Sequence, residues 1–308
     1  MPVNSEQKQY NTCPVCSSAI DTWRVKIVGN DKYNLDLCGS CGYSFVNPRP
    51  SFDFLMNYYS TFGHGHNHSD AKKEAPNYLS VLAQEQNDPN STIDAKRLIR
   101  TIKSLVNNDS SNKFLDVGCG YGFFSKEAQE AGFDVVALEL AENERAIAEK
   151  MTGLNPVASS FEEFECAPES LSVVFMSQIL EHALDINLWI KKSRDFLVKD
   201  GILAIALPNY GSIFRKIMQE NEPYICPPAH LNFFNPNSLS KLLEHHGFKV
   251  EAIQWISRIP KRTFEKRLPR LGKPILPIIN VASSASLKIV DTLHLGMMIN
   301  VYGRKMSA

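Results

Sequence analysis

Phe114-Leu-Asp-Val-Gly-Cys-Gly-Tyr-Gly122 is the stretch of sequence that decides the fold class. It starts as a short apolar strand and ends in three glycines that alternate with other residues. Such glycines let the backbone turn tightly, and they let a ligand approach where a Cβ atom would otherwise intrude. The next residues, 123–131, have the composition of a helix, whose first N–H groups are available to a ligand. A strand, a glycine turn and a helix in this order predict a nucleotide-binding βα unit.

Strand-like and helix-like segments alternate after this turn. Strands are predicted at residues 134–140, 157–159, 171–177 and 202–207, helices at 142–151 and 186–197, and then a helix at 238–246 followed by strands at 249–256 and 298–302. Ser238 is the expected N-cap of the last helix, and Gly247 follows its C-terminus. Alternation at this spacing is typical of an α/β protein with a largely parallel sheet and helices on both faces.

Two acidic residues near the glycine turn indicate which ligand it binds. The spacing is GxGxG rather than the GxGxxG of dinucleotide enzymes, and Asp116 lies two residues before the first glycine. An acid there is unfavourable for a phosphate but suits a ligand with a positive charge. Glu139 ends the next strand, where an acid can accept hydrogen bonds from both ribose hydroxyls. S-adenosylmethionine is a nucleoside with a cationic, phosphate-free tail, so it matches what both acids indicate. An NAD site and a purely structural turn are the alternatives.

The order of motifs along the chain resembles that of class I S-adenosylmethionine-dependent methyltransferases, in particular the UbiG-like or Methyltransf_23-like members. The run LDVGCGYG…VVALEL is similar to motif I of that family and to the acidic strand end that follows it. Further blocks that resemble the family lie at residues 171–185, 196–201, 230–234 and 238–248. The resemblance covers roughly residues 92–257.

This resemblance implies a Rossmann-like sheet that is mostly parallel with an antiparallel last strand, and S-adenosylmethionine as the cofactor. It also implies which residues contact that cofactor. The methionine and ribose end would be lined by Asp116, Gly118, Cys119, Gly120 and Gly122, the ribose would be held by Glu139, the adenine would lie near Leu140, Ser160 and Phe161, and the methionine and the acceptor would border Ser177, Gln178 and Ile179.

Four cysteines form two CxxC pairs near the N-terminus, Cys13 with Cys16 and Cys38 with Cys41. Each pair places two thiolates on one turn, and two such turns supply the four ligands of a tetrahedral zinc ion. Four protein ligands leave no open position, so we expect a structural Zn²⁺ in a small zinc-ribbon-like β module that needs the metal to fold. Unrelated reduced pairs and a redox CxxC are the alternatives, but a redox pair would open a helix of a thioredoxin-like unit, which this region lacks.

The cysteine segment runs into Phe45-Val-Asn-Pro-Arg-Pro50, and together they are similar to bacterial methyltransferases of sugar and cell-surface glycan pathways. This similarity implies a small-molecule, nucleotide-sugar or glycan acceptor. We therefore predict methyl transfer to a sugar hydroxyl, in the biosynthesis of a bacterial polysaccharide, a glycolipid or a secondary metabolite. Methylation of a sugar carbon is an alternative. The oligomeric state is left open.

Transfer to a hydroxyl requires a base that removes a proton, besides an acceptor aligned with the S–CH₃ bond. His182 and His230 are the candidate catalytic residues, because both lie in motifs expected at the carboxyl edge of the sheet, where open α/β folds bind ligands. The structural alternatives are that His182 caps a turn and that His230 packs in the core. Glu181 and His182 could instead hold a divalent ion.

Aromatic and histidine residues are concentrated between residues 58 and 68. His64, His66 and His68 alternate in a glycine-containing run, and they are consistent with a metal site, a lid over the active site or a plain loop. The aromatic residues in 58–62 could cover the cofactor or the acceptor, or could pack within a helical cap.

The 33 lysines and arginines balance 33 aspartates and glutamates, and a net charge of zero argues against nucleic acid as the main partner. Basic residues are nevertheless concentrated in 258–273, and apolar residues 274–290 follow. Together these segments could contact a membrane face, a lipid-linked acceptor or a diphosphate, or could form a solvated helical face.

Because we find no apolar signal segment and no membrane span, we expect a cytoplasmic protein, with peripheral contact at the inner membrane face as a variant.

The chain is thus expected to divide into four parts. These are a zinc-ribbon-like module (1–50), a helical cap or linker (51–110), an S-adenosylmethionine-binding Rossmann-like domain (111–257), and a basic and apolar insertion with a final strand (258–308).

Three other functions compete with the leading prediction. An RNA methyltransferase is disfavoured because residues 177–180 lack the N/D-P-P-Y/F motif of enzymes that methylate exocyclic amines of bases. A cofactor-binding scaffold without activity is disfavoured by the intact glycine turn and Glu139. A hydride-transferring enzyme is disfavoured by the GxGxG spacing and Asp116.

Overall fold

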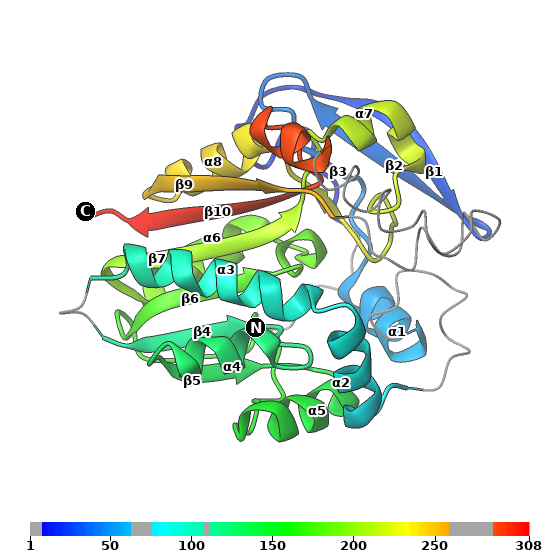
Figure 1. Ribbon diagram of the computed structural model, residues 1–308. Helices are drawn as coiled ribbons and strands as arrows, with labels where there is room; N and C mark the ends of the chain where they lie inside the picture. The colour runs from blue at the N-terminus through cyan, green and yellow to red at the C-terminus, as the bar shows by residue number, and fades with distance from the viewer. Residues whose placement is uncertain (1–7, 63–74, 108–110, 259–285, 308) are drawn as a thin grey trace.

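The computed structural model describes residues 8–62, 75–107, 111–258 and 286–307. Figure 1 shows a large sheet flanked by helices, with a smaller sheet beside it that is built largely from N-terminal residues. This arrangement confirms the predicted α/β class. None of the described helices is both long and apolar enough to cross a membrane.

The large sheet has the strand order β5-β4-β6-β7-β10-β9. Its strands are β4 (Lys113–Val117), β5 (Asp134–Leu138), β6 (Leu171–Ser177), β7 (Leu197–Pro208), β9 (Phe248–Ile256) and β10 (Met298–Lys305). Four neighbours, β5, β4, β6 and β7, are parallel, whereas β10 is antiparallel to both β7 and β9. The carboxyl ends of β4, β5 and β6 therefore lie along one edge of the sheet. The predicted parallel sheet with an antiparallel last strand is confirmed.

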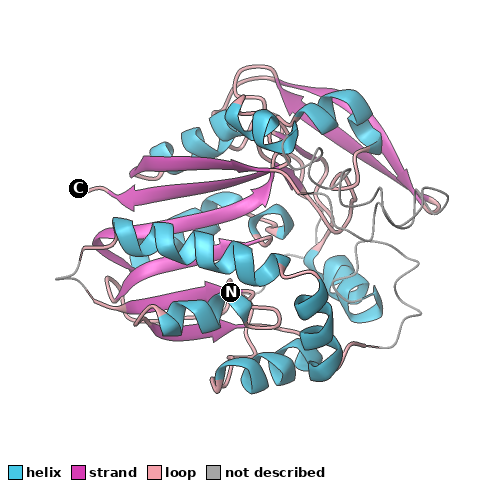
Figure 2. Cartoon of the chain, viewed as in Figure 1, coloured by secondary structure: helices cyan, strands magenta, loops and turns pink. Residues whose placement is uncertain are grey.

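Helices cover both faces of the large sheet (Figure 2). They are α3 (Asn90–Leu105), α4 (Phe123–Glu130), α5 (Glu142–Thr152), α6 (Ile186–Phe196) and α8 (Pro236–His245). Successive residues of a strand point to opposite faces. Phe114 and Phe175 accordingly pack in the core with α3 and α4, whereas Leu115 and Val174 pack in the core with α6 and α8.

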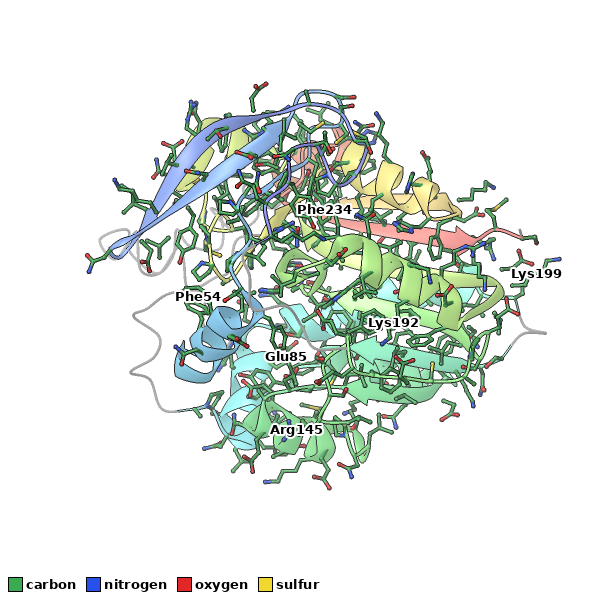
Figure 3. All side chains as sticks on the ribbon, turned by 180° about the vertical axis from the view of Figure 1, so that it is seen from behind. Phe54, Glu85, Arg145, Lys192, Lys199 and Phe234 are labelled. Atoms are coloured by element: carbon green, nitrogen blue, oxygen red, sulfur yellow. The ribbon has the colours of Figure 1, made fainter. Side chains whose placement is uncertain are left out.

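The smaller sheet is antiparallel, and it combines strands that are far apart in the sequence. Its order is β1 (Ile20–Val28), β2 (Asp31–Cys38), β3 (Ser44–Val46) and β8 (Asn232–Phe233). Ser44 pairs with Phe233, so the fourth strand comes from the C-terminal half of the chain. Phe234, labelled in Figure 3, lies where the two sheets meet, with its ring centroid 4.9 Å from that of Tyr43. Buried residues of both sheets belong to one continuous core.

The remaining described elements are helical. They are α1 (Phe52–Phe62), α2 (Tyr78–Asn87), α7 (Ile213–Met218) and the 3₁₀ turns η2 (Leu180–His182) and η3 (Gln219–Asn221), and residues 286–292 are also helical. The turn η2 follows β6 closely, so it places residues 180–182 at the carboxyl edge.

Two predictions of local structure are wrong. Residues 157–159 form a single bridge, between Val157 and Leu138, instead of a strand. Val157 and Ala158 are exposed, so an extended strand there would gain little from burial. The N-cap of α8 is Asn235 rather than Ser238, and its side chain accepts from the Ser238 N–H at 2.9 Å. The Asn235 N–H in turn donates to the Ser238 hydroxyl oxygen at 3.0 Å, which completes a capping box that starts three residues earlier than predicted.

Candidate functional site

The four cysteines of the two CxxC pairs lie together. The Sγ atoms of Cys13 and Cys41 are 3.6 Å apart, those of Cys16 and Cys38 are 3.5 Å apart, and all four atoms lie within 4.8 Å of one another. Four sulfurs at about 2.3 Å from a tetrahedral zinc ion would be about 3.8 Å apart, so the cluster fits zinc. All four thiols are free of disulfides, and three of the four residues are buried.

Backbone turns hold these thiols in place. The N–H of Cys13 donates to the carbonyl of Ser18 at 2.9 Å, and the N–H of Gly42 donates to the carbonyl of Cys38 at 2.8 Å. Gly42 has a φ of 75°, which favours glycine because other residues are strained there. The ligands are therefore set by two local turns, at residues 13–18 and 38–43. Four cysteine ligands would fill all four coordination positions of the zinc ion, so the site is structural rather than catalytic.

The glycine turn joins β4 to α4 as the sequence predicts. A Cβ atom on Gly118 would come within 2.7 Å of the Ile179 side chain, so glycine lets the turn approach the end of β6. Gly122 is the residue before α4, with a φ of 83°. The N–H of Cys119 donates to the carbonyl of Leu138 at 2.8 Å and so attaches the turn to β5.

Glu139 lies beside the glycine turn, directly after β5. Its carboxylate accepts from the Gly120 N–H at 3.0 Å and from the Ala141 N–H at 2.9 Å, and the residue is 6% exposed. Arg145 on α5, labelled in Figure 3, donates to the main-chain carbonyls of Glu139 and Leu140. These contacts fix the bend after β5, so the carboxylate is held in one orientation at the carboxyl edge.

Asp116, the other acid of the motif, is buried on β4. It accepts a hydrogen bond from the Ser125 hydroxyl at 2.6 Å, and burial raises the pKa of its carboxyl to about 7. The contact with Ser125 joins the strand before the glycine turn to the helix after it. Asp116 thus supports the shape of the turn.

A pocket of about 370 Å³ opens at the carboxyl edge, within the range typical of ligand sites. It is lined by Phe52, Leu55, Val117, Gly118, Leu138, Glu139, Leu140, Ala141, Ser159, Ser160, Phe161, Glu162, Ile179, His182, Leu184 and Trp189. Its walls therefore come from α1, from the ends of β4 and β5, from the segment 159–162, from the turn after β6 and from Trp189 of α6.

The pocket unites some of the predicted site residues and leaves others outside. The predicted residues in its walls are Gly118, Glu139, Leu140, Ser160, Phe161, Ile179 and His182. The predicted residues outside its walls are Asp116, Cys119, Gly120, Gly122, Ser177, Gln178 and His230. Gly120 supports the first group through its hydrogen bond to Glu139. Gln178 has a φ of 57°, a conformation that costs free energy in a residue other than glycine.

Nine wall residues were not predicted from the sequence, namely Phe52, Leu55, Val117, Leu138, Ala141, Ser159, Glu162, Leu184 and Trp189. Trp189 donates from its indole N–H to Glu162 at 2.8 Å, and Lys192, labelled in Figure 3, donates to the Glu162 carbonyl at 2.8 Å. These bonds fix the segment 159–162 against α6. The amphipathic spacing of α6 was visible in the sequence, but nothing in it indicated that Trp189 reaches a pocket.

The two candidate catalytic histidines lie against each other. Their ring centroids are 4.8 Å apart, with the ring planes at 82°. The Nδ1 atoms of His182 and His230 each lie 2.7 Å from a main-chain carbonyl, of Ala229 and Tyr224 respectively. Because a carbonyl only accepts, Nδ1 donates in both rings, and in a neutral ring the proton-accepting nitrogen is Nε2. His182 borders the pocket, whereas His230 is 1% exposed and lies behind it.

Glu181 lies next to both rings and is 1% exposed. Its carboxylate and one nitrogen from each of His182 and His230 lie within 4.8 Å of one another. Among the described residues, neither carboxylate oxygen has a hydrogen-bond partner, and burial raises the pKa of Glu181 to about 8. The carboxyl therefore carries its proton at neutral pH. The alternative that Glu181 and His182 hold a divalent ion stays a prediction.

This raised pKa makes folding stability depend on pH. The unfolded chain releases the proton near the ordinary value of 4.5 and the folded chain near 8, so stability should fall as the pH rises between these values. We expect Glu181→Gln, which has the same size and does not titrate, to be more stable than the wild type at pH 9 by on the order of a few kcal/mol. Urea unfolding at pH 6 and pH 9 measures this, with the exposed Glu163→Gln as control. Equal pH dependence in Glu181→Gln and the wild type would contradict the assignment.

Residues 90–253 match the protein family Methyltransf_23, described as Methyltransferase domain, and this range is more than half of the 308 residues. The chain belongs to this methyltransferase family. S-adenosylmethionine is the methyl donor of the family. The family predicted from the sequence is therefore confirmed, as is its cofactor.

This methyltransferase domain is similar to curated proteins and to a solved structure. The ubiquinone biosynthesis O-methyltransferase of Pelagibacter ubique is 30% identical over 159 residues, which are 45% of this chain and 65% of the relative. The mitochondrial enzyme of the same description from Bos taurus is 24% identical over 159 residues, 47% of this chain and 43% of the relative. The matches thus span less than two thirds of either relative. An S-adenosylmethionine-dependent methyltransferase from Archaeoglobus fulgidus shares the fold, with a TM-score of 0.50, 19% identity, and coverage of 73% of this chain and 99% of that chain.

Two of the sequence predictions fall outside the described residues. These are the predictions for His64, His66 and His68 and for most of the basic and apolar segment 258–290. Arg258, at the start of that segment, is described and pairs with Asp94 on α3 at 2.9 Å. Tyr58 is described as well, and it is buried in α1.

Proposed function

We propose that this protein transfers a methyl group from S-adenosylmethionine to a hydroxyl group of a small-molecule acceptor. The observation that carries the proposal is that Glu139, Gly118 and His182 all line a single pocket. Glu139 suits a ribose, and His182 suits a reacting hydroxyl. Cofactor and acceptor would therefore meet in the same cavity.

Bound S-adenosylmethionine supplies a methyl group on a positively charged sulfur, which leaves as a neutral thioether. The protein residues would bind and orient the cofactor and the acceptor and would exclude water from the pocket. Glu139 would accept the ribose hydroxyls, and Leu140 and Phe161 would pack against the adenine. His182 would take the proton of the acceptor hydroxyl at Nε2, since Nδ1 is occupied by the Ala229 carbonyl.

We consider two classes of acceptor for this pocket. The sugar hydroxyl predicted from the sequence stays the first. The pocket that His182 borders also has the apolar wall residues Phe52, Leu55 and Leu184, and apolar walls favour an aromatic ring. This observation, together with relatives described as ubiquinone biosynthesis O-methyltransferases, makes a ring hydroxyl on an apolar molecule the second candidate.

A panel of acceptors separates the two classes. Purified protein would be incubated with labelled S-adenosylmethionine and either nucleotide sugars or phenols that carry a short polyprenyl tail. Label in a nucleotide sugar supports the first class, and label in a phenol supports the second. If neither class takes up label at any pH while the cofactor binds, hydroxyl methylation of these molecules is refuted.

We expect His182→Gln to reduce the rate of methyl transfer by roughly 10²–10⁴-fold, the usual contribution of a general base. Binding of S-adenosylmethionine should stay within about twofold, because Glu139 and the glycine turn are unchanged. Steady-state kinetics and calorimetry measure both quantities.

The matched control is His245→Gln, an exposed histidine at the end of α8. It should leave both the rate and the affinity unchanged. A His182→Gln enzyme with the wild-type rate would remove His182 from the mechanism and turn attention to His230.

A further inference from the structure

A buried group of side chains joins the four-cysteine module to the turn that carries His182. It consists of Tyr43, Arg49 and Asn232, which we name the Arg49–Asn232 clamp. Their exposed fractions are 0%, 1% and 2%. None of the three lies in the walls of the pocket at the carboxyl edge. The clamp therefore lies outside the pocket that is proposed to hold both the cofactor and the acceptor.

On one side the clamp is part of the cysteine module. Tyr43 lies two residues after Cys41, and its carbonyl accepts from the Cys38 N–H at 2.9 Å. The Arg49 guanidinium lies 5.4 Å from the ring centroid of Phe45, a β3 residue in the same core as the cysteines. The positions of Tyr43 and Arg49 therefore depend on the fold of the module, which the metal would stabilise.

On the other side the clamp holds the main chain around His182. The side-chain NH₂ of Asn232 faces the carbonyls of Leu180, Glu181 and Ala183 at 3.1, 3.3 and 2.8 Å. The carbonyl of Glu181 also accepts from the Leu231 N–H at 2.8 Å. The carbonyls on both sides of His182 are thus bonded to the segment 231–232.

Within the clamp, Arg49 and Tyr43 set the orientation of the Asn232 amide. The Asn232 Oδ1 accepts from the Tyr43 hydroxyl and from the Arg49 guanidinium, both at 2.5 Å. Arg49 also donates to the carbonyl of Leu231 at 2.6 Å. Because Oδ1 faces two donors, the NH₂ group must face the carbonyls of the turn. In a flipped amide the NH₂ group would face the Tyr43 and Arg49 donors and Oδ1 would face the carbonyls, so neither would form a hydrogen bond.

A contribution to folding stability does not by itself explain why an arginine is buried at position 49. Among the described residues no carboxylate forms an ion pair with Arg49, and its Nε atom has no hydrogen-bond partner. Burying a charge without a counter-charge costs several kcal/mol, and an apolar side chain would fill the space at a lower cost. What the planar guanidinium adds is direction, since it bonds Asn232 and Leu231 at fixed angles.

We propose that Arg49 and Asn232 are positioning residues, through which the four-cysteine module holds the turn Leu180–His182 in its reactive orientation. The proposal rests on the proposed function, in which His182 takes the proton of the acceptor. Loss of the clamp then slows proton removal while the cofactor still binds, because Glu139 and the glycine turn lie on other elements. The metal module acts on the rate of the reaction and leaves cofactor affinity alone.

Asn232→Asp is the sharpest test. The carboxylate keeps the size of the side chain and still accepts from Arg49 and Tyr43, but it cannot donate to the three carbonyls of the turn. We expect the rate of methyl transfer to fall at least about tenfold, as small misplacements of catalytic groups do, with S-adenosylmethionine affinity within about twofold of wild type. The imidazole signals of His182 and His230 in NMR spectra should shift, with one zinc ion per chain retained.

Two further variants complete the experiment. Arg49→Lys keeps the charge and loses the planar fork, and it should change the rate and the imidazole signals in the same direction as Asn232→Asp. Asn237→Ala is the control, because Asn237 bonds the Cys41 carbonyl at 3.0 Å without reaching the turn, and it should behave as wild type. Unchanged imidazole signals in Asn232→Asp, or a loss of cofactor affinity as large as the loss of rate, would overturn the proposal. Shifted imidazole signals would uphold the clamp even if no acceptor tested were methylated, and in that case the proposed function alone would fail.

Discussion

Glu139→Ala is expected to weaken the binding of S-adenosylmethionine by about 100-fold or more, or about 3 kcal/mol. The variant removes the group proposed to accept both ribose hydroxyls. It also removes the acceptor of the Gly120 and Ala141 N–H groups, so the bend after β5 loses its support. Calorimetric titration of wild type and variant with S-adenosylmethionine and S-adenosylhomocysteine measures the effect.

The control for this prediction is Glu149→Ala, which removes an exposed acid from α5 without touching the pocket. It should bind the cofactor as wild type does. NAD serves as the competing ligand. Wild-type protein that binds NAD and neither adenosyl compound would show that the pocket has been assigned to the wrong cofactor.

Cys38→Ser is expected to abolish zinc binding and to lower the melting temperature by about 10 °C or more. Cys38 ends β2 and is fully buried in the core that the cysteine module shares with the large sheet. Loss of one of four thiolates therefore loosens a core and not only a peripheral loop. Zinc content and thermal unfolding followed by circular dichroism measure the two effects together.

Cys166→Ser is the matched control for Cys38→Ser. Cys166 is half-buried outside the cluster, and its sulfur lies 3.8 Å from the Ser170 hydroxyl. It should retain one zinc ion and the wild-type melting temperature. A stable, fully folded Cys38→Ser protein without zinc would mean that the core holds the module together unaided.

The features that could be predicted from the sequence depend on residues close together in the chain. The ligands of the metal site lie on two short turns, and the glycine turn needs only nine residues, 114–122. Glu139 could be predicted because a parallel strand that follows the turn must end at the same edge. These features are local consequences of spacing and backbone geometry.

What could not be predicted depends on contacts between distant segments. Phe52 and Leu55 belong to the segment 51–110, which was predicted as a helical cap or linker, and only the folded chain brings them to the pocket. Arg49 and Leu231 are 182 residues apart, and neither has a local signal that indicates the other. His230 could be selected as a histidine in a motif, but its position behind His182 depends on how the segment 224–231 crosses the edge of the sheet.

The pairing of β3 with β8 has a consequence for the order of assembly. The two cysteine turns precede the strands of the large sheet in the sequence, so they can capture zinc while synthesis of those strands is under way. Strand β3 then remains an open edge until Asn232 and Phe233 have been made and have crossed back to it. Open edges invite pairing with other chains, so the ribosome-bound intermediate is most exposed to aggregation between these two events. The smaller sheet therefore gains its fourth strand only after strands β4 to β7 of the large sheet have been made.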